Sequence, residues 1–229
     1  MADPVPRHIG YVVDGNRRWA KKHGLPGYEG HMAGYNTIQD VVLETFNRGV
    51  EYVSAYIFST ENWKRSEQEV SKLMTLVLKL LTSDLRILEE NNIRLKILGS
   101  RENVSDKIIK AIDDAEERTK SNTKGTLAIC FNYGGHLEIA DAVKKIVQSK
   151  TKPEAITPDM IAANLYVPEV PPVDVVVRTS GEQRLSNFML WRAAYSEFIF
   201  LDKLWPDMTK EDVTAILKEY SRRNRRFGG

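Results

Sequence analysis

The first residues whose types and spacing could do chemistry lie where the first apolar segment ends. Residues 8–19 read His-Ile-Gly-Tyr-Val-Val-Asp-Gly-Asn-Arg-Arg-Trp, so a predicted strand stops at Asp14 and a helix follows. A strand-to-helix turn exposes backbone N–H groups at a partly positive helix terminus, which binds anions such as phosphate. A carboxylate within such a cradle indicates a divalent cation, Mg²⁺, between Asp14 and phosphate oxygens. The alternative is an ordinary Asp-Gly-Asn turn followed by a basic, solvated helix face.

Polar residues also follow three later predicted strands. These segments are residues 59–63, residues 132–136 and residues 178–184. In open α/β sheets ligands bind outside the carboxyl ends of the strands, so we expect these segments to meet. The arginines among and beside them are Arg18, Arg65, Arg178 and Arg184. Converging arginines suit two phosphate groups or one diphosphate, although each arginine alone could form a surface salt bridge.

Motifs of several other chemistries are missing from the sequence. There is no Gly-x-x-x-x-Gly-Lys-Ser/Thr loop, no Gly-x-Gly-x-x-Gly after the first strand, and no Gly-x-Ser-x-Gly. There is also no His-Glu-x-x-His and no pair of cysteines for a zinc site. What remains is Mg²⁺-assisted departure of a diphosphate, which needs positioning and charge neutralisation but no protein nucleophile.

The elements that must position these residues alternate between two hydrophobic periodicities. Strands are predicted over residues 9–13, 50–58, 95–98, 127–131, 173–177 and 198–201. Helices are predicted over residues 31–47, 70–88, 104–119, 137–147, 187–195 and 209–222. This alternation predicts an α/β fold with a mostly parallel sheet of about six strands flanked by helices. The linker-like stretches 150–158 and 168–172 are too short to separate domains, so we expect residues 1–229 to form a single domain.

Composition narrows the classes of partner. The 229 residues are 42% hydrophobic and carry 33 basic against 31 acidic side chains, a net charge of +2 that argues against a nucleic-acid partner. The single cysteine, Cys130, excludes a disulfide scaffold and fits a reducing cytoplasm. We expect no signal peptide, because a strand follows within ten residues of the start. No apolar run approaches the roughly 18 residues of a membrane span, so membrane contact is expected to be peripheral.

A series of motifs, in order along nearly the whole chain, resembles the cis-prenyltransferase family, whose best-known members are the undecaprenyl diphosphate synthases. They are Val-Asp-Gly-Asn-Arg-Arg-Trp-Ala at 13–20, Glu-Gly-His-x-x-Gly at 29–34, Phe-Ser-Thr-Glu-Asn-Trp-x-Arg at 58–65, Asn-Tyr-Gly-Gly at 132–135, Arg-Thr-Ser-Gly-Glu-x-Arg-Leu-Ser-Asn-Phe at 178–188, Trp-Pro-Asp at 205–207 and Arg-Arg-Phe-Gly-Gly at 225–229. The resemblance implies Mg²⁺-dependent condensation of isopentenyl diphosphate with an allylic diphosphate, such as farnesyl or geranyl diphosphate, to give a cis-polyprenyl diphosphate. It also implies a single catalytic domain, a homodimer and an apolar tunnel for the growing chain.

The resemblance further implies roles at the allylic site. Asp14 would hold Mg²⁺ and help the allylic diphosphate to leave. The donors to that diphosphate would be Gly15, Asn16, Arg17, Arg18 and His31. Trp19 would stack near the mouth of the site for the allylic tail, unless it is an ordinary core tryptophan. Many members carry an arginine four positions before the histidine of Glu-Gly-His, where this chain has Gly27, and Arg17 beside Arg18 could replace that contact.

Other roles concern the isopentenyl unit and the metal. The loop beneath the substrates would comprise Ser59, Thr60 and Glu61, and Trp63 and Arg65 would close over the homoallylic substrate. Asn62 would take part in removing the proton, by relaying or orienting it, because a neutral amide is a poor base. The residues that would bind the diphosphate of isopentenyl diphosphate are Arg178, Arg184, Leu185 and Ser186. Glu197 would supply a second carboxylate toward the metal, or else be an exposed charge at a helix end.

Two features bear on the tunnel and on the chain's end. The predicted helix over residues 70–88 has a wider apolar stripe than packing on a sheet requires, so part of it could line the tunnel. The terminal residues Arg223, Arg225, Arg226, Phe227, Gly228 and Gly229 resemble a tail that reaches toward the phosphates of a neighbouring subunit. The alternative is a frayed basic terminus.

Ile57 bears on product length. Strand alternation places Ala55 and Ile57 on one face, opposite Tyr56 and Phe58. The position of Ile57 is a small alanine beside the tunnel in the long-chain bacterial relatives. A branched side chain there predicts a product shorter than the undecaprenyl class, unless the neighbouring helix lies further out.

Two other classes of function fit the same sequence less well. The chain could be a non-catalytic subunit of a heteromeric cis-prenyltransferase, but such a partner is expected to lose the metal carboxylate, and Asp14 and Asn62 are both present. It could also be a nucleic-acid or phosphoester-binding module that uses the same arginines. The near-neutral charge and the absence of a basic stripe argue against that module.

Overall fold

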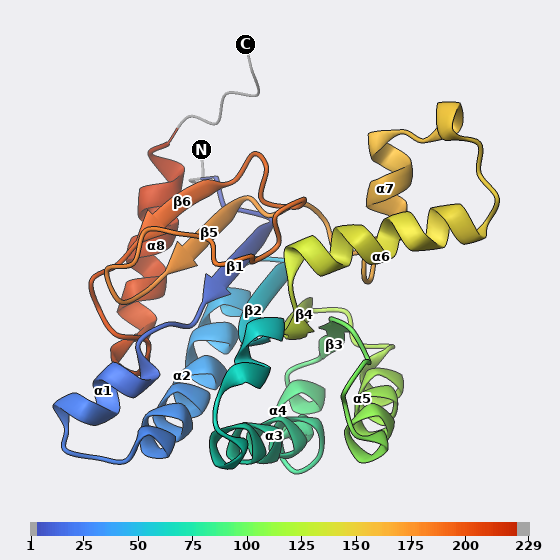
Figure 1. The fold of residues 1–229 in the computed structure, drawn as a ribbon. Helices are drawn as coiled ribbons and strands as arrows, with labels where there is room; N and C mark the ends of the chain where they lie inside the picture. Colours follow the sequence, from blue (N-terminus) through green and yellow to red (C-terminus); the bar gives the residue numbers. More distant parts are fainter. Residues whose placement is uncertain (1–3, 224–229) are drawn as a thin grey trace.

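Six parallel strands form the centre of the computed structural model, which describes residues 4–223 (Figure 1). The strands within these residues are β1 (His8–Val12), β2 (Tyr52–Ser59), β3 (Ile93–Leu98), β4 (Gly125–Tyr133), β5 (Val175–Arg178) and β6 (Glu197–Phe200), in the spatial order β3-β4-β2-β1-β5-β6. Every residue of β1, β5 and nearly all of β4 is buried, as expected of parallel strands that are covered on both faces. The predicted single-domain α/β architecture is confirmed.

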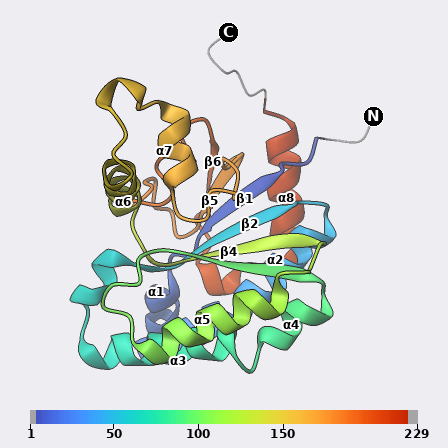
Figure 2. The same cartoon turned by 90° about the vertical axis from the view of Figure 1, so that its right-hand side faces the viewer.

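The helices divide between the two faces of this sheet. They are α1 (Asn16–Lys22), α2 (Gly27–Asn47), α3 (Glu67–Leu81), α4 (Leu85–Glu90), α5 (Asp106–Thr119), α6 (Gly135–Gln148), α7 (Pro158–Asn164) and α8 (Lys210–Ser221), with short 3₁₀ turns at Thr60–Lys64, Pro153–Ala155 and Trp205–Asp207. Figure 2 shows α2, α3, α4 and α5 on one side and α6 and α7 on the other. The larger apolar core lies under the first group, and the smaller core lies between the other face of the sheet and the segments 166–173 and 185–193.

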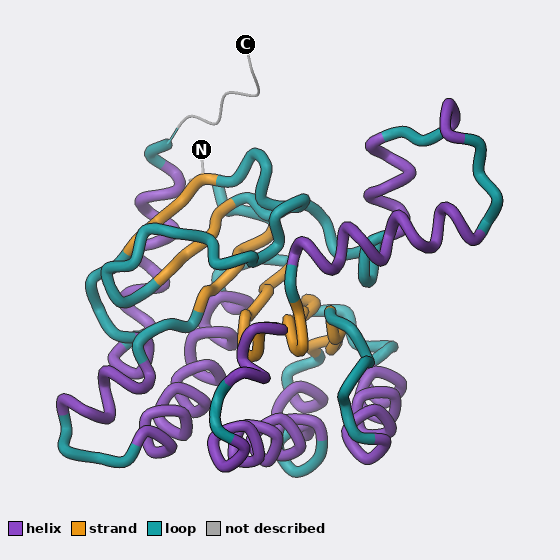
Figure 3. Tube along the Cα trace, viewed as in Figure 1, coloured by secondary structure: helices purple, strands orange, loops and turns teal. Residues whose placement is uncertain are grey.

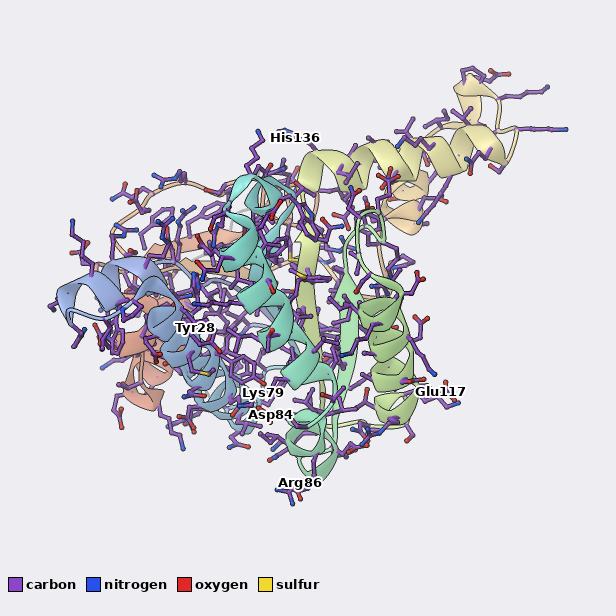
Figure 4. All side chains as sticks on the ribbon, turned by 60° about the horizontal axis from the view of Figure 1, so that its bottom comes forward. Tyr28, Lys79, Asp84, Arg86, Glu117 and His136 are labelled. Carbon is purple, nitrogen blue, oxygen red and sulfur yellow. The ribbon has the colours of Figure 1, made fainter. Side chains whose placement is uncertain are left out.

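The predicted helix over residues 70–88 is two helices, so that prediction is wrong at its centre. The chain leaves α3 at Thr82, whose ψ is −86°, and resumes as α4 after Asp84. The Asp84 carboxylate accepts hydrogen bonds from the Tyr35 hydroxyl at 2.7 Å and from Gln39 at 3.1 Å, and it pairs with Lys79 at 3.2 Å. Figure 4 shows Lys79 and Asp84 side by side at this junction. These contacts with α2 fix the bend between the two helices.

The predicted helix over residues 187–195 does not form. The segment is a series of turns, and Figure 3 shows no helix between β5 and β6. Asn187 and Met189 have left-handed backbones with φ of 66° and 42°, which a right-handed helix excludes. The buried Arg192 side chain donates to the Glu138 carboxylate of α6 at 2.6 Å, so distant contacts set the path of this segment.

Two smaller differences concern α7 and β2. The stretch 150–158, taken above as a linker, leads into α7, where Thr157 accepts a hydrogen bond from Met160 N as an N-cap. In β2 the register with β4 shifts between Tyr56 and Phe58, as in a β-bulge. Phe58 therefore packs in the same core as Ala55, so the prediction that it lies on the opposite face is wrong.

No helix within residues 4–223 is long and apolar enough to cross a membrane.

Candidate functional site

A cleft of about 730 Å³ opens at the carboxyl ends of β1, β2 and β5. Val12 of β1 stands in register with Arg178 of β5 and with Tyr56 of β2, so the residues that follow these strands converge. The predicted site residues that line the cleft are Asp14, Gly15, Asn16, Arg17, Arg18, His31, Ser59, Asn62, Arg65, Arg178 and Ser186. The structure thus brings together residues up to 172 positions apart, from Asp14 to Ser186, as expected of residues that follow parallel strands.

Asp14 lies between two arginines. Its Oδ2 accepts from Arg178 Nη2 at 2.8 Å, and its Oδ1 lies 3.3 Å from Arg18 Nη2. Its backbone carbonyl accepts from the Thr179 hydroxyl at 2.6 Å and from Trp205 N at 3.0 Å. The carboxylate is therefore held in place from both sides of the β1 turn, with its charge balanced by two guanidinium groups.

Arg178 organises the floor of the cleft. Its side chain is almost fully buried, and its Nη1 donates to Ser186 Oγ at 2.8 Å and to the carbonyl oxygen of Arg184 at 2.5 Å. Its buried Nε has no partner among the described residues. An unpaired buried guanidinium N–H costs free energy, so this group favours an anionic ligand beside it.

Glu182 is a site residue that the sequence analysis missed. It accepts from Arg184 Nη1 and pairs with Arg18 Nη1 at 3.0 Å. The hydrogen bond from Arg184 holds the pKa of the Glu182 carboxyl below its usual range. The Glu182 carboxylate thus pairs with both Arg18 and Arg184, which were predicted to bind different diphosphates. The sequence alone does not show this connection between the two arginines.

Glu69 is a second missed residue, on α3 beside the cleft. Its Oε1 lies 3.4 Å from His31 Nε2 and 3.0 Å from Arg65 Nη1. Burial lowers the pKa of His31, and the nearby Arg65 lowers it further, against the opposing effect of Glu69. His31 is therefore held mainly as a neutral imidazole at neutral pH, and its single N–H, on Nε2, faces the Glu69 carboxylate, which can only accept.

The 3₁₀ turn after β2 presents Asn62 to the cleft. Asn62 Oδ1 accepts from Ser59 N at 3.1 Å, which leaves the amide N–H₂ group as the donor for a ligand. Trp63 Nε1 donates to Asn132 Oδ1 at 2.8 Å, so the turn is tied to the end of β4. Thr60 and Glu61 belong to the same turn but are not among the residues that line the cleft.

Besides Thr60 and Glu61, five predicted site residues are not among those that line the cleft: Trp19, Trp63, Arg184, Leu185 and Glu197. Trp19 donates through Nε1 to Asp207 Oδ1 at 2.7 Å and packs on His23 with ring centroids 4.1 Å apart, outside the set that lines the cleft. Leu185 packs against the smaller core. Glu197 begins β6 opposite Val175 and accepts from Arg223 at 3.2 Å.

Glu197 therefore lies at the amino end of the sheet, whereas Asp14 follows the carboxyl end of β1. A single chain does not bring the two carboxylates together. Arg223 is the only residue of the predicted terminal tail that the structure describes, and it pairs with Glu197 and with Glu219. Residues 225–229 of that tail lie outside the described residues.

Two glycines explain the spacing of the Glu-Gly-His-x-x-Gly motif. A Cβ added at Gly30 would lie 2.0 Å from the Asn16 carbonyl oxygen, and one added at Gly34 would lie 2.2 Å from Asn16 Oδ1. Both distances are impossible for a side chain, so α2 carries glycine wherever the start of α1 rests on it. The motif thereby places Asn16 and His31 together at the wall of the cleft.

The residues of the cleft fit Mg²⁺ only if the ion is shared between Asp14 and the phosphates of a substrate. Within residues 4–223 no three His, Cys, Asp or Glu side chains are grouped to hold a metal ion. Mg²⁺ is often held by one or two carboxylates together with substrate phosphates and water, rather than by a cage of protein ligands. Asp14, alone among arginines that attract phosphate, has the chemistry of such a shared site.

A small apolar cavity adjoins the cleft. It measures about 60 Å³, lies between the sheet and helices α2 and α3, and is lined by Val13, Asn16, His31, Gly34, Tyr35, Ile38, Ile57, Phe58, Leu73, Leu76, Val77, Leu80 and Ile129. Ile57 and Phe58 line both spaces. One water molecule occupies about 30 Å³ in the liquid, so the cavity has the volume of about two water molecules. It is therefore too small to be an open tunnel.

Comparisons with known proteins identify the family of the chain. Residues 12–228 match the family model described as putative undecaprenyl diphosphate synthase. The isoprenyl transferase of Thermotoga maritima is 44% identical over 227 residues, which cover 98% of this chain and 97% of that protein. A trans,polycis-polyprenyl diphosphate synthase of Thermobifida fusca, described as (2Z,6E)-farnesyl diphosphate specific, is 45% identical over 229 residues, 98% of this chain and 81% of that protein.

A solved structure shares the fold as well. Lavandulyl diphosphate synthase from Lavandula x intermedia, in complex with dimethylallyl diphosphate, superposes with a TM-score of 0.93 at 30% identity and covers 98% of this chain and 99% of that one. Family model, relatives and structure agree over nearly the whole length of the chain. The chain therefore belongs to the undecaprenyl diphosphate synthase family, and it is a prenyltransferase.

Proposed function

We propose that this prenyltransferase condenses isopentenyl diphosphate with an allylic diphosphate, with Mg²⁺ as cofactor, to form a cis-polyprenyl diphosphate. The observation that carries the proposal is the position of Asp14, between Arg18 and Arg178 in a polar cleft that adjoins an apolar cavity. A diphosphate fits the polar part, and a hydrocarbon tail fits the apolar part. Names of the relatives supply candidate primers, from dimethylallyl to farnesyl diphosphate.

The reaction breaks the bond between the allylic carbon and its diphosphate oxygen, forms a carbon–carbon bond to the isopentenyl unit, and releases one proton. Charge accumulates on the departing diphosphate, so preorganised donors accelerate the step. Arg17 and Arg18 line the cleft where they can donate to that group, and His31 would have to exchange Glu69 for the diphosphate to do the same. Mg²⁺ bound at Asp14 would neutralise part of the same charge.

We assign the isopentenyl unit to the side of the cleft that Ser186 and the turn of Asn62 line, with Arg184 two residues before Ser186 in the chain. Ser186 is fixed by Arg178, and Arg184 is an exposed cation that can exchange Glu182 for a diphosphate. Asn62 has a free amide N–H₂ group, which can orient this substrate but cannot accept its proton. The proton then leaves through a diphosphate oxygen or water.

The proposal includes the remaining expectations from the sequence. Residues 1–229 act as one catalytic domain and assemble as a homodimer in the cytoplasm, where peripheral contact with a membrane surface allows release of the lipophilic product. The chain acts as the catalytic protein rather than as a non-catalytic subunit, since Asp14 and Arg178 are both present and paired.

A direct assay tests the reaction. Purified protein is incubated with isopentenyl diphosphate and with geranyl or farnesyl diphosphate, and butanol-soluble product is extracted and its mass determined. Product is expected with Mg²⁺, is lost with a chelator, and returns with excess Mg²⁺. Absence of product with every primer, including dimethylallyl diphosphate, would contradict the proposal, and product that forms unchanged in the chelator would contradict the metal.

Asp14→Asn tests the assigned carboxylate without removing its bulk. We expect turnover to fall on the order of 10²–10³-fold, the usual effect of removing one transition-state charge contact. The thermal midpoint should fall, because the neutral amide leaves the buried Arg178 guanidinium without its charge partner, so turnover is measured well below that midpoint. Asp40→Asn, an exposed position on α2, is the control and should keep wild-type turnover. Turnover within about twofold of wild type would refute the role of Asp14.

A further inference from the structure

Asn187 joins segments of the site that are far apart in the sequence. Its Nδ2 donates to Glu61 Oε1 at 3.1 Å, in the turn after β2. Its Oδ1 accepts from His136 N at 2.8 Å, and its backbone oxygen accepts from Gly135 N at 2.7 Å, at the start of α6. Figure 1 shows that this turn and the start of α6 lie next to each other above the strand ends.

The residue before it faces the other half of the site. Ser186 Oγ accepts from Arg178 Nη1 at 2.8 Å, and Arg178 in turn donates to Asp14. Ser186 and Asn187 both have left-handed backbones, with φ of 49° and 66°. Non-glycine residues adopt this conformation at a cost and keep it only where their surroundings fix it, and asparagine tolerates it better than most. This pair thus links the Asp14 side of the cleft to the turn that carries Asn62.

The turn after β2, the start of α6 and the loop of Asn187 are in close contact, so a shift of one would move the others. A Cβ added at Gly134 would lie 2.8 Å from Thr60 Oγ1 and 2.9 Å from Asn187 Nδ2, so glycine lets the turn and the loop approach each other. Burial would raise the pKa of Glu61, but hydrogen bonds, including the one from Asn187, outweigh burial and lower this pKa overall. Glu61 is therefore an ionised acceptor for the Asn187 amide at neutral pH.

We propose that Asn187 is a positioning residue that sets the distance between the two substrate-binding segments, the Arg178–Ser186 side and the turn of Asn62. This inference rests on the proposed function. Two reactants must be held about 3–3.5 Å apart for efficient reaction, and a displacement of about 1 Å can cost on the order of 10²-fold in rate. One amide that fixes both segments is thus expected to act on the rate of condensation more than on the affinity for either substrate.

Asn187→Asp isolates the contact with Glu61. The substitution keeps the size of the side chain and the oxygen that accepts from His136 N, but it removes the N–H donor and places two carboxylates together. We expect the single-turnover rate with both substrates saturating to fall about 10- to 100-fold, with KM values changed less than the rate. The thermal midpoint should stay close to that of the wild type, because the cap of α6 is retained.

A second substitution reverses the hydrogen bond. Combining Asn187→Asp with Glu61→Gln gives an amide at position 61 that can donate to the carboxylate at position 187, with the net charge of the wild type. We expect the double variant to recover most of the lost rate. A role in folding alone predicts that the loss and the recovery of rate follow the thermal midpoint, whereas a positioning role predicts that they occur at an unchanged midpoint.

Asn92→Asp is the matched control. Asn92 also has a left-handed backbone, with φ of 55°, and its Oδ1 accepts from Thr123 N at 3.0 Å while its Nδ2 donates to Thr123 Oγ1 at 3.1 Å, just before β3 and away from the cleft. Its turnover should equal that of the wild type. A wild-type protein without turnover would overturn the proposed function and this inference with it. Wild-type turnover of Asn187→Asp, or a double variant no faster than the single one, would overturn this inference alone.

Discussion

At the scale of single residues, the site depends on how its arginines are divided between the protein and the ligands. Arg178 is 4% exposed and its contacts run to Asp14, Ser186 and the Arg184 carbonyl. Arg184 is exposed and contacts only the side chain of Glu182 in the described interactions. The two residues share a motif, but the first builds the site and the second is free to bind a substrate.

This division predicts different kinetics for two alanine variants. Arg184→Ala should raise KM for isopentenyl diphosphate about 10- to 100-fold with a smaller change in kcat, since a charge-assisted contact is worth about 1.5–3 kcal/mol. Arg178→Ala should lower kcat as well, because Asp14 and Ser186 lose their common partner. Steady-state kinetics with each substrate varied in turn measures both effects. A rise in KM for the allylic primer alone would show that the two diphosphate sites are assigned in reverse.

The sequence was sufficient to place the residues that directly follow the strand ends, whereas their roles stay predictions. Asp14, Arg18 and Asn62 follow strand ends and line the cleft as the strand pattern predicts. Glu69 and Glu182 were missed because a glutamate acquires its role here from partners brought to it by the fold. Trp19 was placed by resemblance, whereas its indole N–H is taken by Asp207, which lies 188 positions away.

At the scale of elements, the local apolar pattern predicted most helices and strands. Where the structure differs, contacts with residues distant in the sequence determine the path of the backbone. Apolar spacing alone extends α3 through Thr82, but Asp84 binds Tyr35 and Gln39 of α2 and the helix bends there. The apolar segment after Ser186 is helical by spacing, but the buried pair of Arg192 with Glu138 holds it in turns. A pattern within one segment does not contain these partners.

The bulge in β2 matters for product length. It brings Phe58 to the same side as Ala55, and it leaves Ile57 partly buried where the polar cleft meets the apolar cavity. Ile57 therefore stands at the passage that a growing hydrocarbon chain would take toward α2 and α3. Its branched side chain narrows that passage, since close-packed interiors do not absorb added volume without strain.

Ile57→Ala should lengthen the product. The substitution removes three carbons from the wall shared by the cleft and the cavity, more than half of one isoprene unit, at a stability cost of about 2–5 kcal/mol if the side chain packs fully. Mass analysis of products at equal extents of reaction measures the change, and Ile109→Ala on α5, a partly buried position outside both spaces, controls for loss of packing. Wild-type product of undecaprenyl length, or a variant with an unchanged product, would make Ile57 an ordinary core residue.

At the scale of the whole molecule, the cleft and a buried histidine that connects several strands lie at opposite ends of the sheet. The cleft lies at the carboxyl ends of the strands, while His8 begins β1 at the amino end. The His8 ring is fully buried, with Nδ1 2.9 Å from the Pro171 carbonyl oxygen and Nε2 2.8 Å from Ser54 Oγ. A carbonyl oxygen can only accept, so Nδ1 carries the proton and Nε2 accepts from the Ser54 hydroxyl. One neutral imidazole thus joins β1, β2 and the segment before β5.

This arrangement predicts how stability depends on pH. Burial lowers the pKa of His8 to about 4, with Arg192 also lowering it and Pro171 and Asp174 opposing the change. The unfolded chain has a histidine pKa of about 6.5, so between these values the unfolded state binds the extra proton. The contribution of the neutral ring is therefore fully present above pH 6.5 and is lost as the pH falls toward 4. The difference in pKa corresponds to roughly 3 kcal/mol over the whole window.

His8→Asn tests this prediction by removing the titrating ring while keeping an N–H donor near Pro171. Denaturant unfolding at several pH values between 4.5 and 7.5 gives the free energy of unfolding of each protein. With falling pH the free energy of unfolding should decrease more for the wild type than for the variant. The difference between the two slopes should correspond to at most about one proton taken up on unfolding. Because the variant retains the other histidines and the carboxylates, the difference between the two slopes reports His8 alone. Equal slopes for wild type and His8→Asn would mean that the buried ring takes up its proton in the folded state as readily as in the unfolded chain.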